Sequence, residues 1–198
     1  MIKFLNLTKQ KPYTIFFEKY QQALKAKQKN IEAISVASFN SKKKEIDTRF
    51  VNLKHIEDDK FIFFTNYESS KAKDFNSHSQ IAVAIFWSSI NFQIRMKAKI
   101  KKTSQKYNRE YFRNRAQNKN ALSISSNQSQ KIASYDNVKE KYNYSKKNHN
   151  LSICPSYWGG YSFKPYEIEF WTGNDSRINE RNLYTYKNGL WVQSILEP

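Results

Sequence analysis

The spacing of hydrophobic residues predicts one helix and then a series of strands in the first half of the chain. Aromatic and aliphatic side chains recur at helical spacing from Pro12 to about Lys29, with charged residues on the other face. From Ile31 the period changes to two, which is typical of strands. We expect strands over residues 31–39, 48–56, 61–65, 81–87 and 91–102, with a short helix over 69–77. The strand over 81–87 is apolar throughout and is expected to be buried.

The second half combines helical segments with three terminal strands. Residues 104–118 and 137–148 have helical character, and residues 120–136 have a weaker helical pattern. The segment 151–160 contains Pro155 and the pair Gly159-Gly160, so it is expected to be irregular. Strands are expected over 165–173, 181–187 and 190–196. The dipeptide Asn188-Gly189 predicts a hairpin between the last two.

About eight strands and three or four helices follow one another without a regular alternation of strand and helix. This order favours an α+β fold, an antiparallel barrel or sheet with flanking helices, over a parallel α/β fold. We found no repeat and no linker in the 198 residues. We therefore expect a single domain over 1–198, with an N-terminal helical segment at 1–30 and C-terminal strands at 165–198.

Composition narrows the possible partners and location. The chain has 34 Lys and Arg against 17 Asp and Glu, a net charge of +17, which raises the possibility of a nucleic-acid partner. However, only seven of the 34 are arginine and the lysines are spread along the chain, which favours a solvated basic surface. The longest apolar run has seven residues, and no apolar leader is present. We expect a cytoplasmic protein without membrane or nucleic-acid partners.

Several classes of chemistry lack their sequence signals. His55, His78 and His149 are far apart, and Cys154 has no second cysteine, so no metal site or disulfide is expected. The chain contains only four glycines and no phosphate-binding glycine loop or nucleophile elbow.

Two groups of residues could bind anions. Tyr111, Arg115 and Lys119 are spaced by four and would share one face if the helix continued, forming either a phosphate clasp or an ordinary basic helix surface. Arg177 and Asn179, with Arg181 two residues further on, point the same way in an extended segment downstream of Trp171, or are plain turn residues.

The strand over residues 48–56 and a later loop carry further polar candidates. Arg49 and Lys54 lie on that strand at odd spacing, so a bulge or a ligand across the strand edge would be needed to bring both to one molecule. The polar pair Gln128-Ser129 indicates little by itself.

The order of these segments resembles the pyridoxine/pyridoxamine 5′-phosphate oxidase family. The resemblance extends from the first helix to the C-terminus and rests on an ordered set of short segments. They are Lys11–Phe16, Arg49–Lys54, Phe64–Lys71, Phe86-Trp87 with Gln93, Tyr111–Arg115, Ser126–Ser129, Trp158–Gly160, Ile168–Gly173, Arg177–Arg181 and Trp191–Pro198. Four of the seven arginines fall within these segments at family positions: Arg49, Arg115, Arg177 and Arg181.

The resemblance implies a dimeric split β-barrel with FMN at the subunit interface, and it implies roles for individual residues. The cofactor would be bound by Arg49, Phe50, Val51, Asn52, Leu53, Lys54, Phe64, Thr65, Lys71, Gln93, Gln128, Ser129, Trp171 and Arg181, some of them from the partner subunit. The substrate phosphate would be bound by Lys54, Tyr111, Arg115 and Lys119, and Arg177 and Asn179 would flank the substrate over the flavin as catalytic residues.

The implied activity is oxidation of pyridoxamine or pyridoxine 5′-phosphate to pyridoxal 5′-phosphate, with O2 as acceptor and H2O2 released. This chain departs from the family pattern at several positions. The family usually has His at Asn179, Arg at Ser70, Ser at Lys119, Arg at Phe92 and Tyr at Phe64. An FMN-binding split barrel with altered or lost chemistry is therefore the main alternative, and a non-enzymatic binder of anions or nucleic acid is a second one.

Overall fold

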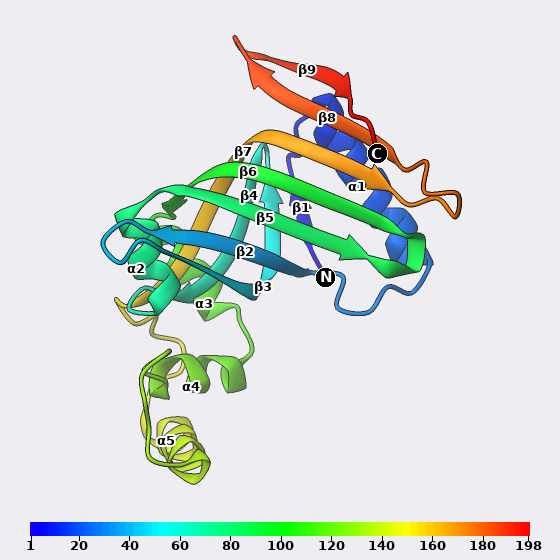
Figure 1. Cartoon of the computed structure of the whole chain (residues 1–198). Helices are drawn as coiled ribbons and strands as arrows, with labels where there is room; N and C mark the ends of the chain where they lie inside the picture. The colour runs from blue at the N-terminus through cyan, green and yellow to red at the C-terminus, as the bar shows by residue number, and fades with distance from the viewer.

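The computed structural model describes all residues from 1 to 198, and its centre is a closed six-stranded β-barrel (Figure 1). The barrel closes because β4 pairs with both β3 and β7, while β3, β2, β5, β6 and β7 are hydrogen-bonded in that order. All of these pairs are antiparallel. The barrel strands are β2 (Ala33–Asn40), β3 (Glu45–Glu57), β4 (Lys60–Asn66), β5 (Gln80–Trp87), β6 (Phe92–Lys102) and β7 (Trp158–Thr172). The predicted fold class, an antiparallel split barrel with flanking helices, is confirmed.

Alternating side chains on the strands fill the barrel interior. On β5, Ile81, Val83, Ile85 and Trp87 are buried, as expected for the inward face of a pleated strand. The three residues between them, which include Phe86, are exposed, so the expectation that this apolar run is buried on both sides was wrong. The outer face of β5 is thus apolar and open to solvent.

Helix α1 (Lys11–Lys25) covers one side of the barrel through aromatic contacts. Phe16 packs edge-on against Phe61 and Trp87, at centroid distances of 5.2 and 5.5 Å. Tyr13 and Tyr20 on the same helix face are buried as well. The helix ends at Lys25, four residues earlier than predicted, because the chain turns at Lys27, which has a φ of 54°.

The structure corrects the predicted strands in two places. A short strand, β1 (Lys3–Leu5), was missed; it pairs parallel to β3 and lies outside the barrel. Strand β7 begins at Trp158 and includes Gly159 and Gly160, which were expected in an irregular segment. Glycine is needed at this point because a Cβ at Gly159 would lie only 2.2 Å from Tyr67 Oη.

The predicted helix over 104–118 is in fact two helices. Helix α3 (Gln105–Arg113) ends at Asn114, and α4 (Gln117–Ser125) begins after Ala116. The break is stabilised by Asn120, whose Nδ2 donates to the carbonyl of Phe112 at 2.8 Å. In the segment 120–136, which has a weak helical pattern, only residues 120–125, in α4, and residues 135–136, at the start of the following helix, are helical.

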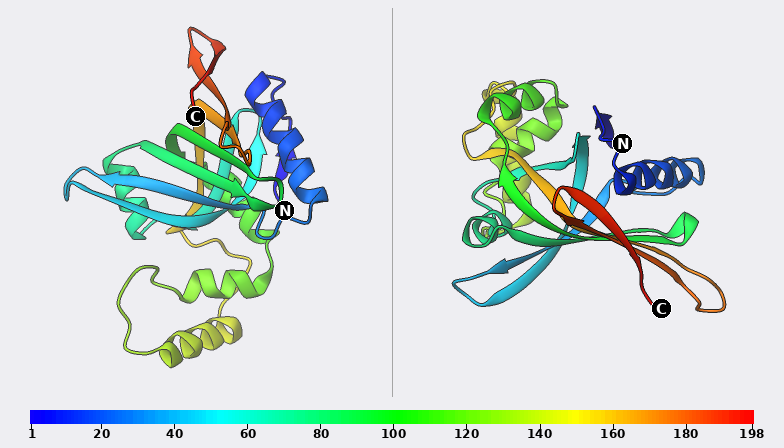
Figure 2. Two further views of the ribbon diagram at one scale, coloured as in Figure 1. Left: turned by 45° about the vertical axis from the view of Figure 1, so that its right-hand side comes forward. Right: turned by 90° about the horizontal axis from the view of Figure 1, so that it is seen from above.

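The remaining elements lie at the periphery. Helix α2 (Ser70–Ser77) packs beside β2, and α4 and α5 (Tyr135–Asn148) form a separate pair next to the barrel (Figure 1). Strands β8 (Glu180–Lys187) and β9 (Leu190–Ile195) form the predicted hairpin, with Asn188-Gly189 at its turn, and the hairpin extends away from the barrel (Figure 2). A one-turn 3₁₀ helix, η1 (Ser88–Ile90), connects β5 to β6. None of the helices is both long and apolar enough to span a bilayer.

Candidate active site

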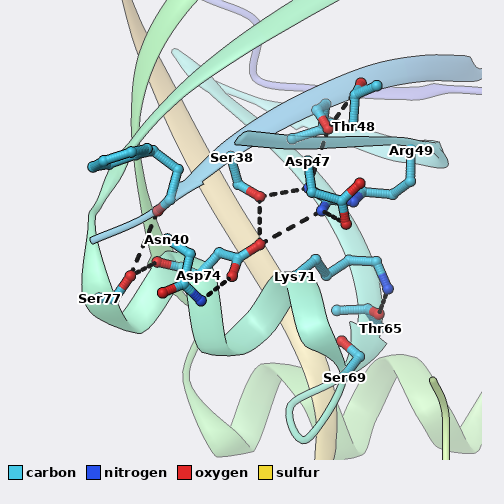
Figure 3. A network of polar contacts seen from close by, with 12 residues as sticks. Ser38, Asn40, Asp47, Thr48, Arg49, Thr65, Ser69, Lys71, Asp74 and Ser77 are labelled. Carbon is cyan, nitrogen blue, oxygen red and sulfur yellow. Dashed lines mark hydrogen bonds and ion pairs between the residues drawn. The ribbon is translucent and has the colours of Figure 1, made fainter. Parts of the chain in front are cut away.

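A cluster of cationic and hydroxyl side chains lies where β3, β4 and α2 meet (Figure 3). Arg49 reaches from β3 toward Ser38, and Lys71 reaches from α2 toward Thr65 on β4. Gln128 Oε1 accepts hydrogen bonds from Thr65 Oγ1 at 3.2 Å and from the backbone N–H of Asn66 at 3.3 Å. Four residues that were predicted to bind the cofactor are therefore brought close together by segments far apart in the sequence.

Lys71 carries the clearest indication that this cluster binds an anion. Its side chain is buried, with 7% of its surface exposed, yet its only polar contact is Thr65 Oγ1 at 3.4 Å and it forms no ion pair. Burial, and after it the neighbouring Arg49, lower the pKa of Lys71. Because a buried charge is costly without an opposite charge, the cluster fits a phosphate group.

Arg49 is already engaged by two carboxylates. Its guanidinium donates to Ser38 Oγ and to Asp47 Oδ2, both at 2.6 Å, and lies 3.5 Å from Asp74 Oδ2. Asp74 is itself held by hydrogen bonds from Ser38 Oγ and Asn40 Nδ2, both at 2.8 Å. Neither aspartate was singled out from the sequence, because carboxylates are not expected beside an anion site.

The rest of the predicted cofactor strand divides by side-chain direction. Leu53 is fully buried in the core and Val51 packs against that core, so Leu53 can offer only its backbone to a ligand. Phe50 lies on the opposite face and is 77% exposed. Lys54 is the extra residue of a β-bulge, because the pairing with β4 shifts between Leu53 and His55. A bulge, one of the two ways considered for bringing Arg49 and Lys54 to one molecule, is thus present, but Arg49 lies in the cation cluster and Lys54 lines a separate cleft.

The four residues predicted to bind the substrate phosphate line one cleft. Its volume is about 740 Å³, and Lys54, Tyr111, Arg115 and Lys119 all contribute to its wall, together with Asn52. The expectation that Tyr111, Arg115 and Lys119 share one helix face was wrong, because Arg115 lies in the turn between α3 and α4. The three side chains nevertheless line the same cleft, one from α3, one from the turn and one from α4.

Contacts within the cleft hold these side chains in place. Lys54 Nζ lies 2.5 Å from Glu32 Oε1. Burial by itself would raise the pKa of the Glu32 carboxyl, but the hydrogen bond from Lys54 outweighs it and holds this pKa below its ordinary value. The Arg115 guanidinium donates to Ser123 Oγ at 2.7 Å and to the carbonyl of Lys119 at 3.1 Å. Burial lowers the pKa of Arg115, although its ordinary value is so high that the group stays charged.

One aromatic residue of the cleft wall, Tyr111, belongs to a stack of rings. Phe64, a predicted cofactor residue, stacks on Tyr111 with a centroid distance of 3.6 Å and on Trp158 at 5.3 Å. The guanidinium of Arg115 lies 5.0 Å from the centre of the Trp158 ring. Burial raises the pKa of the Tyr111 phenol, which therefore remains protonated and able to donate a hydrogen bond.

Sequence reasoning did not single out His55 and Tyr107 of the cleft wall, whose Nδ1 and Oη lie 2.6 Å apart. It also missed Glu32, which contacts Lys54 but does not itself line the cleft. Burial, followed by the charges of Lys3 and Lys54, lowers the pKa of His55, so its imidazole is neutral near pH 7. The position of His55 next to Lys54 was the one available signal, but no sequence pattern connected it to Tyr107.

A second set of predicted residues forms a row on the outer face of the sheet. Gln93 on β6 pairs with Trp171 on β7, and Trp171 pairs with Arg181 on β8. The exposed Phe86 on β5 continues the row, because it pairs with Gln93. Arg181 Nε donates to Glu169 Oε1 at 2.8 Å. Strand β2 separates this row from Arg49 on β3.

Three predicted residues lie apart from both the cation cluster and the cleft. Arg177 and Asn179 belong to the loop between β7 and β8, and Arg177 has a φ of 63°. Asn179 Oδ1 accepts a hydrogen bond from the backbone N–H of Asn174, so the contacts of Asn179 stay within the loop. Ser129 is exposed and, unlike Gln128, makes no contact with Thr65.

Comparison with known proteins identifies the family. The pyridoxamine 5′-phosphate oxidase model matches residues 19–142, and the pyridoxine 5′-phosphate oxidase C-terminal dimerisation region matches residues 158–198. The second match supports formation of a homodimer.

Relatives and solved structures agree with this assignment. The chain is 32% identical over 195 residues to pyridoxine/pyridoxamine 5′-phosphate oxidase 2 of Hydrogenovibrio crunogenus, covering 98% of this chain and 91% of the relative. It is also 32% identical over 191 residues to the corresponding oxidase of Christiangramia forsetii, covering 94% of this chain and 88% of the relative.

Two crystal structures share the fold. PhzG from Burkholderia lata 383, solved with tetrahydrophenazine-1-carboxylic acid, superposes with a TM-score of 0.88 at 21% identity, covering 95% of this chain and 93% of that one. A pyridoxamine 5′-phosphate oxidase-related, FMN-binding protein of Nostoc punctiforme has a TM-score of 0.78 at 10% identity, with coverages of 96% and 99%. The chain therefore belongs to the pyridoxamine 5′-phosphate oxidase family, and its cofactor is FMN.

Proposed function

We propose that this protein is an FMN-dependent oxidase that converts pyridoxamine or pyridoxine 5′-phosphate to pyridoxal 5′-phosphate, with O2 as the acceptor. The observation that carries the proposal is the 740 Å³ cleft, in which Lys54, Arg115 and Lys119 converge beside the Tyr111 phenol. Even with the carboxylates of Glu57 and Glu110 in the wall, these three cations and the phenolic donor leave a positive balance that suits a phosphate dianion. The rings of Tyr107 and Tyr111 in the same wall suit a planar substrate ring.

The FMN phosphate would be bound by the cation cluster of Arg49, Lys71 and Thr65, with Gln128 fixing the Thr65 hydroxyl. Lys71 supplies a buried ammonium without a carboxylate partner, so an incoming phosphate would satisfy it. The row of Gln93, Trp171 and Arg181 would contact the flavin from the outer face of the sheet. Bound FMN would supply the redox chemistry, taking a hydride from the C4′ carbon of the substrate and returning two electrons to O2 with release of H2O2. With the amine substrate, water would then hydrolyse the resulting iminium group to the aldehyde, with release of ammonia.

Within the cleft the protein positions the substrate and keeps charges balanced. The short contact with Glu32 fixes the Lys54 ammonium at the bulge of β3. Arg115 is held by Ser123 and by the Lys119 carbonyl, so its guanidinium is oriented before a substrate arrives. Such preorganisation lowers the entropy lost on binding.

Arg177 and Asn179 would be supplied to this cleft by the partner subunit, since their loop does not reach the cleft of its own chain. Arg177 would lie over the reacting carbon. Asn179 can donate and accept a hydrogen bond there but cannot titrate, whereas the family usually has a histidine.

The experiment that tests the proposal is release of H2O2 by the purified protein supplied with excess FMN and pyridoxamine 5′-phosphate. Unphosphorylated pyridoxamine serves as the comparison substrate. We expect Lys54→Met to raise the KM for the phosphorylated amine by about tenfold, because one charge-assisted contact is lost. Lys106→Met, an exposed lysine on α3 outside the cleft, is the matched control.

The outcomes separate the alternatives. A yellow protein that releases no H2O2 with either phosphorylated vitamer would contradict the oxidase and support a flavoprotein with altered chemistry. The replacements at Asn179 and Ser70 are the observations that favour that alternative. A colourless protein whose binding to DNA weakens steeply with salt would instead favour an anion binder.

A further inference from the structure

We propose that Asp47 is a displaceable counter-ion that occupies the place of the FMN phosphate beside Arg49 and Lys71, and that it lowers the affinity of this protein for FMN. The inference rests on the proposed function, because it assumes that the FMN phosphate binds at this cation cluster. It assigns a role to a residue that contacts no substrate and whose charge opposes that of the ligand.

The two carboxylates beside Arg49 differ in how firmly they are held (Figure 3). The side chain of Asp74 is 8% exposed, and hydrogen bonds from Ser38 and Asn40 fix both of its oxygens. The side chain of Asp47 is 63% exposed, and the guanidinium of Arg49 is its only side-chain partner. Asp74 is thus a permanent part of the site, whereas Asp47 can turn into solvent without leaving a buried polar group unsatisfied.

The Asp47 carboxylate also acts on the second cation of the cluster. Among the charges that influence Lys71, Arg49 lowers its pKa and Asp47 raises it. A single carboxylate therefore partly neutralises both groups that would bind the phosphate. Asp47 and Arg49 are two residues apart on β3, so their side chains project from the same face of the strand and the contact costs no backbone rearrangement.

Displacement follows from the strengths of the competing contacts. An ion pair with an exposed partner changes an equilibrium constant by only about fivefold at most. A phosphate forms several charge-assisted hydrogen bonds at once, and it also gives the buried Lys71 ammonium a full counter-charge. FMN would therefore replace Asp47, but the contact with Asp47 must first be broken, and this reduces the observed affinity.

The test compares the binding of FMN and of riboflavin, which lacks the phosphate, to the apo dimer by quenching of flavin fluorescence. We expect Asp47→Asn to lower the Kd for FMN by about three- to fivefold and to change the Kd for riboflavin by less than twofold. The matched control is Glu45→Gln, which removes the same charge from an exposed position on the same face of β3 that forms no ion pair. A similar gain for Glu45→Gln, or equal gains for FMN and riboflavin, would overturn the inference.

A third variant separates this inference from the proposed site. Lys71→Met should raise the Kd for FMN at least tenfold and leave riboflavin binding nearly unchanged. If Lys71→Met has this effect and Asp47→Asn has none, the site stands and the role of Asp47 is rejected. If Lys71→Met does not alter FMN binding, the placement of the phosphate itself is wrong, and the role of Asp47 is rejected with it.

Discussion

Two regions of the molecule carry arginine and other polar residues predicted to act in the site: the cation cluster at β3, β4 and α2, and the loop between β7 and β8. They differ in how many contacts these residues make with other elements of the same chain. In the cluster, Arg49 and Lys71 are anchored by paired strands and a packed helix, and their polar contacts are made within the chain. In the loop, Arg177 is exposed, and the side chain of Asn179 bonds only to the backbone of its own loop.

Under the proposed function, this difference means that one subunit would provide the phosphate-binding residues of a site and its partner would provide the loop between β7 and β8. The cluster and the cleft each gather cationic and hydroxyl donors from a single chain, so each chain would be able to hold the anionic ends of cofactor and substrate by itself. The loop has no counterpart in its own chain, and the row of Gln93, Trp171 and Arg181 lies on an open face of the sheet. Under the proposed function, the residues that act over the flavin ring would therefore come together only in the homodimer.

The largest effect is expected from removing Arg177. Arg177→Ala should lower kcat for pyridoxamine 5′-phosphate by about 100-fold, because a group aligned with the reacting carbon is lost. FMN occupancy, measured from the flavin absorbance, should stay within about twofold, because Arg177 is not part of the cation cluster. Arg113→Ala, an exposed arginine at the end of α3, is the control. Unchanged turnover in Arg177→Ala would reject the role assigned to this residue.

A complementation experiment tests the division of labour directly. Lys54→Met and Arg177→Ala chains would be expressed together with different tags and assayed at a substrate concentration well below the KM, where the two variants alone should keep about a tenth and about a hundredth of the wild-type rate. If a site combines Lys54 of one chain with Arg177 of the other, each mixed dimer keeps one intact site, and random pairing restores about a quarter of the wild-type activity. If each site lies within one chain, every site carries a defect and the activity stays at the level of the single variants.

The sequence predicted much of the fold because its signals are local. The short apolar run of β5 and the Asn188-Gly189 turn of the last hairpin each depend on a few neighbouring residues. The grouping of Lys54 with Tyr111, Arg115 and Lys119 followed from the family resemblance, and the structure brings all four to one cleft. The reason given for the last three, a continuous helix, was wrong, because the Asn120 side chain stabilises a break that helical periodicity does not reveal.

What the sequence could not predict depends on contacts between distant segments. Glu32 precedes β2 and meets Lys54 on β3, and Tyr107 on α3 meets His55, 52 positions away. Asp74 was not identified because its partners, Ser38 and Arg49, are joined to it only when α2 packs beside β2 and β3. No sequence period encodes such pairs, since each partner alone is an ordinary polar residue.

Restoring the missing arginine of the cluster should strengthen it. Ser70 is exposed at the start of α2, directly before Lys71, where the family usually has arginine. Ser70→Arg adds one charge-assisted contact to the FMN phosphate and should lower the Kd for FMN by about tenfold, with riboflavin binding unchanged. Ser70→Gln, of similar length but uncharged, should give less than half of this gain in free energy. Equal effects of both substitutions would indicate packing instead of charge.

The smallest effect concerns pH and tests whether the Lys71 ammonium itself holds the phosphate. Burial, followed by Arg49, holds the pKa of Lys71 in the apo protein below the ordinary 10.5. The FMN phosphate binds the charged ammonium form of Lys71, so the affinity for FMN is highest at pH values below the lowered pKa of Lys71. The affinity declines as the pH rises through that pKa, at a lower pH than the one at which an exposed lysine would lose its charge. We expect a several-fold rise in the Kd for FMN relative to riboflavin between pH 7 and about 10. Lys71→Arg keeps its charge throughout this range, so its ratio of the two affinities should stay constant. A ratio that falls equally in both proteins would show that some other group titrates.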